Sequence, residues 1–90
     1  MSKIDEICDV LARMSRLLLF CDLNDWAHML NTIASKAGDG YAVVRPDIRK
    51  MYGGMGSLND IVLYRDGRVL KDENDEFDSL RGRLYELTRD

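Results

Sequence analysis

The stretch GGMGSLND, residues 53–60, brings three glycines, a serine, an asparagine and an aspartate close together. Consecutive backbone amides in such a stretch can form a nest that binds phosphate. A phosphate loop, however, places its glycines after a strand and before a helix, and it ends in Gly-Lys-Ser/Thr. Here no lysine follows, and the apolar run Ile61-Val62-Leu63-Tyr64 comes after the glycines. The dinucleotide-binding fingerprint fails for the same topological reason.

We therefore expect this stretch to be a structural hinge between a helix and a strand. Gly53 or Gly54 supplies a positive φ angle, Met55 packs inward, and Asn59 or Asp60 hydrogen-bonds the turn. An exposed loop of this kind is also a candidate recognition surface, and binding of an anion or nucleotide stays open as an alternative. The residues with these structural or recognition roles are Gly53, Gly54, Met55, Gly56, Ser57, Asn59 and Asp60.

A second group of chemically active residues is acidic: five carboxylates fall within seven positions. A calcium-binding loop that began at Asp72 would need glycine and glutamate where Phe77 and Arg83 stand, so that pattern fails. One or two acidic residues complement a helix N-terminus, and the surplus predicts a negative surface that attracts a basic protein partner. The predicted partner-binding residues are Asp72, Glu73, Asp75, Glu76 and Asp78.

The remaining reactive residues do not form a catalytic or metal-binding pattern. His28 has no nucleophile near it in sequence, and Ser57 lacks the GxSxG turn of a nucleophilic serine. Cys8 lies on the first predicted helix and Cys21 at its end, about 20 Å away at the rise per residue of a helix, so we expect buried thiols and no disulfide. One histidine and no cysteine pair are too few ligands for zinc. We predict a protein that is not an enzyme and that uses no cofactor or metal.

Composition limits the function further. The 90 residues are 46% hydrophobic and 32% charged, as expected for one globular domain over residues 1–90. No apolar run approaches the roughly 18 residues that cross a bilayer, and acidic residues interrupt the N-terminal segment. We expect a cytoplasmic protein without a membrane partner. The net charge of −3 weighs against nucleic acid, although residues 41–71 carry six basic groups against three acidic ones.

The first half of the chain predicts two antiparallel helices. Apolar residues at three-and-four spacing indicate a helix over residues 3–20, with Ser2 as its N-cap. Asp22 or Asn24 is expected to cap the second helix, and Gly38 to end it. The inner face of this second helix is expected to carry Trp26, Met29, Leu30, Ile33 and Ala37.

The second half predicts a mixture of helix and strand. Pro46 is expected in the first turn of a short third helix that ends near Tyr52, while residues 41–44 are ambiguous between strand and helix. Asp-Gly between two β-branched runs predicts a β-hairpin over about 61–70. A last helix, capped by Asn74 or Asp75, is expected to bury Phe77, Leu80, Leu84 and Leu87. The predicted fold class is α+β.

The sequence also resembles a family of small, uncharacterised bacterial proteins. That family is marked by GGMGS, then Leu or Phe, then Asn-Asp and an apolar strand, as in residues 53–64 here. The resemblance extends over about residues 26–87. Its further matching positions are Trp26-Ala27, Arg45, Ile48-Arg49, Leu80-Arg81 and the run from Leu84 to Leu87. It implies no assigned activity.

Small acidic proteins of this kind are similar, in size and charge alone, to the immunity proteins of bacterial toxin systems. Such proteins neutralise a cognate toxin, which is usually basic, by covering its active site. We therefore expect a binding protein of the immunity type with a basic toxin domain as its partner. The alternatives are a small structural or regulatory protein that forms homodimers through the hairpin edge, and an anion- or nucleotide-binding protein that uses Gly53 to Ser57.

Overall fold

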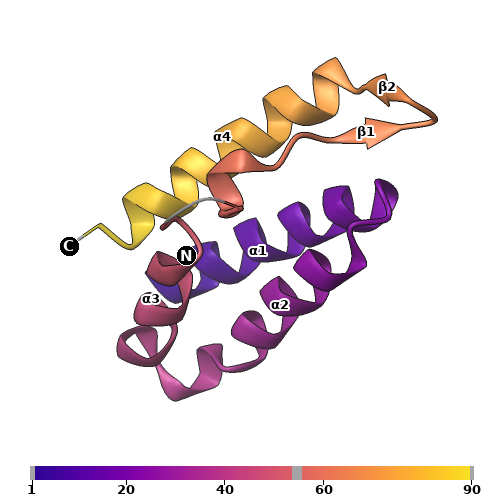
Figure 1. Ribbon diagram of the computed structural model, residues 1–90. Helices are drawn as coiled ribbons and strands as arrows, with labels where there is room; N and C mark the ends of the chain where they lie inside the picture. Colours follow the sequence, from indigo (N-terminus) through magenta and orange to yellow (C-terminus); the bar gives the residue numbers. More distant parts are fainter. Residues whose placement is uncertain (1, 54–55, 90) are drawn as a thin grey trace.

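The structure is a computed structural model that describes residues 2–53 and 56–89. Over these residues the chain forms four α-helices and one two-stranded antiparallel hairpin (Figure 1). The predicted α+β class is confirmed. The helices are α1 (Lys3–Phe20), α2 (Asn24–Ser35), α3 (Tyr41–Lys50) and α4 (Lys71–Leu87), the strands are β1 (Tyr64–Arg65) and β2 (Arg68–Val69), and two short 3-10 helices are η1 (Ala37–Asp39) and η2 (Leu58–Asp60).

Helix α1 is the centre of the fold, because α2 and α4 both pack against it. Its bounds are those predicted, and the Ser2 hydroxyl accepts a hydrogen bond from the Asp5 amide at 3.2 Å, which confirms the N-cap. Its apolar stripe is buried, with Ile7, Val10, Leu11, Met14 and Leu18 in the core. Among the described residues, no helix combines the length and apolar character needed to span a bilayer.

Helix α2 differs from the prediction at both ends. Leu23 stands at its N-cap, and no described side chain caps it there; Asp22 instead turns the chain with φ 59°. The helix ends at Ser35, and Gly38 lies within η1, so neither the predicted caps nor the predicted end is correct. The left-handed turn is made by Gly40, at φ 106°.

The inner face of α2 is also narrower than predicted. Leu30 and Ile33 are buried, together with Ala27, which packs against α1. Met29, however, keeps 46% of its surface exposed, and Trp26 is only half-buried. The reason is geometric: α2 packs mainly against α1 and buries only the stripe of side chains that faces that helix. Trp26 and Met29 lie at the border of this stripe and are therefore only partly covered.

Helix α3 begins five residues before the predicted start. Residues 41–44 are helical, so they do not provide a third strand, and Pro46 lies inside the helix instead of in its first turn. Tertiary burial outweighs the cost of an internal proline: Val44 and Ile48 are both fully buried on the inner face. The amides of Val43 and Val44 donate to Gly40 O at the start of the helix.

The predicted hairpin is confirmed, but its strands are shorter than the predicted range of about 61–70, with two residues each. Tyr64 pairs with Val69, and Asp66 and Gly67 take φ angles of 53° and 77°, as a two-residue hairpin turn requires. One more hydrogen bond, from the Leu70 amide to Leu63 O at 3.1 Å, extends the pairing toward α4.

Helix α4 begins at Lys71, three residues before the predicted cap, and Asn74 therefore lies in its interior. Its side chain attaches the hairpin to the helix instead. The Asn74 amide group accepts a hydrogen bond from the Leu63 amide at 2.8 Å and donates to Leu63 O and Leu70 O at 3.0 and 2.7 Å. The predicted inner face of α4 is confirmed, since Phe77, Leu80, Leu84 and Leu87 are buried.

Candidate functional site

The glycine motif folds into a compact turn that hydrogen-bonds to itself and to its surroundings. Ser57 caps η2, and its hydroxyl accepts from the Asn59 amide at 3.3 Å. Leu58 is fully buried, and its amide donates to Met51 O at 2.7 Å. The Asn59 side chain donates to Tyr52 O at 3.4 Å. The motif therefore fixes the chain as it leaves α3.

The position at which a nest would hold an anion is already used by the chain itself. The Gly56 amide, at φ 71°, donates to the Asp60 carboxylate at 2.9 Å. A phosphate approaching this amide would meet a negative charge of the same turn, which is electrostatically unfavourable. The predicted hydrogen bond from Asp60 to the turn is thus observed. Of the predicted positive-φ residues, Gly53 does not adopt that conformation, while Gly54 and the inward-packing Met55 lie outside the described residues.

Helix α4 contacts this turn through Arg81. The Arg81 guanidinium donates to Leu58 O at 2.9 Å and forms an ion pair with Asp78. The Tyr52 hydroxyl, in the turn that follows α3, donates to Arg81 O at 2.5 Å, so hydrogen bonds run in both directions between α4 and the segment around the glycine motif. Burial raises the pKa of the Tyr52 phenol well above its ordinary value, and the nearby Arg81 and Arg49 charges only partly oppose this.

The basic face of α3 is occupied by the C-terminal end of α4. Arg45 Nε donates to Thr88 O at 3.0 Å, and the Tyr41 hydroxyl donates to Leu87 O at 3.2 Å. Arg49 lies over the Tyr85 ring, 4.2 Å from its centroid. Cations and donors at this end satisfy the last carbonyls of a helix and complement its dipole. These arginines are therefore structural and do not form a free basic patch.

The acidic segment forms the first two turns of α4: Asp72, Asp75, Glu76 and Asp78 are exposed, and Glu73, which precedes the buried Phe77 by one turn, is half-buried. Asp75 pairs with Lys71 at 2.8 Å, and Asp78 pairs with Arg81. The other three carboxylates, Asp72, Glu73 and Glu76, form no ion pair within residues 2–53 and 56–89. The structure thus divides the five predicted partner-binding residues into two with internal salt bridges and three with unpaired charges.

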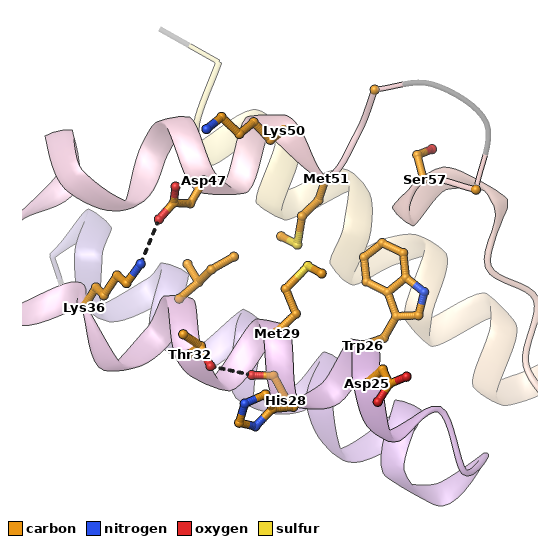
Figure 2. A pocket seen from close by; sticks show the side chains of 13 residues that line it. Asp25, Trp26, His28, Met29, Thr32, Lys36, Asp47, Lys50, Met51 and Ser57 are labelled. Atoms are coloured by element: carbon orange, nitrogen blue, oxygen red, sulfur yellow. Dashed lines mark hydrogen bonds and ion pairs between the residues drawn. The ribbon is translucent and has the colours of Figure 1, made fainter.

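An open groove of about 800 Å³ lies between α2, the end of α3 and the glycine motif. Figure 2 shows Met29 and Met51 reaching toward each other across it, with Trp26 beside them. Its rim is polar and carries an ion pair between Lys36 and Asp47 at 3.5 Å. The groove is an apolar recess, and sequence reasoning did not identify it, because helical spacing does not distinguish a core position from one beside a gap.

His28 and Ser57, two residues of types that can act in catalysis, both line this groove, but no hydrogen bond joins their side chains. Figure 2 shows the His28 ring directed away from Ser57. The Ser57 hydroxyl is buried and serves as the cap of η2, so it is not activated by a base. Nowhere in the described part of the chain do three His, Cys, Asp or Glu side chains converge as metal ligands would.

The two cysteines are free thiols; the sequence predicted buried thiols, and each is half-buried in the structure. Burial raises the pKa of the Cys21 thiol, and the neighbouring carboxylate of Glu73 raises it further. Because only the thiolate is a good nucleophile, this environment lowers the reactivity of Cys21 at neutral pH.

Comparison with known proteins gives one family match. No curated protein and no solved structure matches the chain with significance. Residues 21–71, which run from the end of α1 through the glycine motif to the start of α4, match the family described as Domain of unknown function (DUF6966). This match covers more than half of the 90 residues. The chain therefore belongs to the DUF6966 family of uncharacterised domains.

Proposed function

We propose that this chain is a non-catalytic binding domain that recognises a basic protein. The observation that carries the proposal is the state of the charges on α4. Asp72, Glu73 and Glu76 present unpaired carboxylates, whereas Arg45 and Arg81 are engaged in internal hydrogen bonds. An exposed negative surface attracts a basic partner and accelerates its association.

The glycine motif supports the same proposal by its own bonding. Its donors bind Met51 O, Ser57 Oγ and the Asp60 carboxylate, so the amides of Leu58, Asn59 and Gly56 already have acceptors within the fold. Because these hydrogen bonds hold the glycine motif in one conformation, the domain can present a rigid surface to a partner. Rigid presentation reduces the entropy lost on binding.

The partner class we propose is a basic toxin domain, with this chain as its immunity protein. Small size, net negative charge and an acidic exposed helix are the features on which this analogy rests. In that arrangement the carboxylates of α4 would face the basic groove of the toxin and block it.

The test uses the protein encoded by the reading frame next to this one. We expect that neighbour to slow the growth of host cells, and co-expression of this chain to restore growth through a complex that survives size-exclusion chromatography. A neighbour that neither binds this chain nor is neutralised by it would contradict the proposal. Phosphate and ATP serve as the second probe, because a rise in melting temperature with either would instead favour anion binding at the glycine motif.

A further inference from the structure

The hairpin carries an apolar face that no other part of the described chain covers. Val62, Tyr64 and Val69 keep 45%, 52% and 57% of their surface exposed. Tyr64 stands opposite Val69 in the ladder, and Val62 precedes Tyr64 by two positions, so the three side chains share one face. Leu63, which points to the other face, is fully buried. We call Val62, Tyr64 and Val69 the hairpin face.

The hairpin lies at the end of the molecule where α4 begins (Figure 1). The first two turns of α4 carry the acidic residues. Residues 62–78 contain three basic and six acidic side chains, a net charge of −3. That equals the net charge of the whole chain, so the remaining residues are neutral in sum. The hairpin face is thus an apolar surface set within the negative end of the molecule.

The hairpin is held in place from two sides. Asn74 binds Leu63 and Leu70 from α4, as described above. From the strand side, Arg65 donates to Phe20 O at 2.8 Å and lies over the Phe20 ring, 4.3 Å from its centroid. These contacts fix the hairpin to both α4 and the end of α1. An apolar surface that is ordered before binding loses little conformational entropy when a partner covers it.

We propose that the hairpin face is the apolar anchor of the partner interface, and that its occupant is an apolar patch ringed by lysine and arginine on a basic protein. This inference rests on the proposed function. The aromatic ring of Tyr64 supplies the buried contact, as aromatic residues do at interface centres, and Asp72, Glu73 and Glu76 supply the charged border. A second copy of this chain would bring two ends of charge −3 together, which opposes self-association through this face.

The experiment compares two synthetic peptides of equal length and equal lysine content. One has tryptophan and leucine between its lysines, and the other has serine at those positions. Each is titrated into the wild-type protein, into the double variant Tyr64→Thr/Val69→Thr, which keeps β-propensity and charge, and into the control Met29→Gln/Val43→Thr. The control removes apolar surface of similar exposure, 46% and 42%, away from the hairpin.

We expect the wild type to bind the aromatic peptide at least about tenfold more tightly than the serine peptide. The hairpin variant should lose this preference, and the control should keep it. Amide chemical shifts should change at Tyr64, Val69 and Asp72. Equal affinity for both peptides, or a preference unchanged in the hairpin variant, would overturn the inference, as would a wild-type dimer in sedimentation that the hairpin variant dissociates.

The same variants separate this inference from the proposed function. If the neighbouring protein binds the wild type and the hairpin variant equally, but not a charge-reversed α4, the function stands and the hairpin anchor is wrong. If the neighbouring protein does not bind at all while the hairpin variant still loses its peptide preference, the proposed partner is wrong and the surface stands.

Discussion

Arg81, in the middle of α4, donates a hydrogen bond to the backbone carbonyl of Leu58 in the glycine motif at 2.9 Å. This bond joins two segments that are far apart in sequence. The glycine motif sets the position of Leu58 O, and α4 supplies the charged donor for it.

Removing this donor should destabilise the fold. We expect Arg81→Ala to lower the free energy of unfolding by about 1.5–3 kcal/mol, because a buried carbonyl loses a charged hydrogen-bond partner. Arg81→Lys should cost less, since it keeps the charge but not the planar guanidinium. Chemical denaturation measures both, with Arg16→Ala at an exposed position of α1 as the control. A loss no larger than that of the control would refute the role of Arg81.

The attachment of the hairpin to α4 can be tested by a nearly isosteric substitution of Asn74. Asn74→Asp keeps the shape of the side chain but replaces the amide donor by an acceptor, so its contacts with Leu63 O and Leu70 O become repulsive. We expect a loss of about 1–3 kcal/mol and faster hydrogen exchange at the Leu63 amide. Exchange at Leu63 that is as slow as in the wild type would show that the hairpin is attached in some other way.

Pro46 should be a weak point of α3, because a proline nitrogen has no hydrogen to donate to the carbonyl of Ala42, four residues earlier. Pro46→Ala restores the missing amide inside the helix. An internal proline costs about 3 kcal/mol, and the greater freedom of the unfolded alanine chain offsets up to about 1 kcal/mol of the gain. We expect a higher melting temperature in calorimetry. A lower one would mean that the proline orients the start of the helix.

Tyr52 should make the fold sensitive to alkali. Its pKa is raised in the folded state by burial, so folding favours the protonated phenol. This stabilising contribution is complete below pH of about 10, the pKa of an exposed tyrosine, and it is lost as the pH rises through the folded value.

Tyr52→Phe isolates this effect. The variant loses the hydrogen bond to Arg81 O, at a cost of about 0.5–1.5 kcal/mol near neutral pH. Above pH of about 10, however, its stability should fall less steeply than that of the wild type. Denaturation at a series of pH values measures both slopes, and parallel curves would contradict the assignment.

The parts of the fold that sequence reasoning predicted are those set by local pattern. Helix α1, its Ser2 cap, the Asp-Gly turn and the buried stripe of α4 follow from periodicity and turn chemistry, and all are observed. The errors occur where tertiary contacts override a local signal. In isolation, Pro46 indicates the first turn of a helix. In the fold, burial of Val44 and Ile48 favours a helix that begins earlier, at Tyr41.

The candidate site shows the same division. The acidic residues of α4 could be identified from composition, because their surplus is visible in the sequence. The groove beside Met29 and the pairing of Arg45 with Thr88 O could not, since each depends on how elements distant in sequence meet. The hairpin face is partly predictable. The alternation of side chains along a strand places its residues on one side, but only the structure shows that the fold leaves Tyr64 exposed.

The central claim is that this chain binds a basic protein through the acidic end of α4. Two variants of equal charge change test it: Asp72→Lys/Glu76→Lys on α4, and Asp9→Lys/Asp39→Lys at exposed positions elsewhere. Both should keep the circular dichroism spectrum of the wild type. The measurement is the affinity of each for the protein encoded by the neighbouring reading frame, at low and physiological salt.

We expect the α4 variant to bind at least about tenfold more weakly than the wild type, with the largest difference at low salt, and the control variant to bind nearly as the wild type does. Equal weakening by both variants, or tight binding by the α4 variant, would contradict the claim.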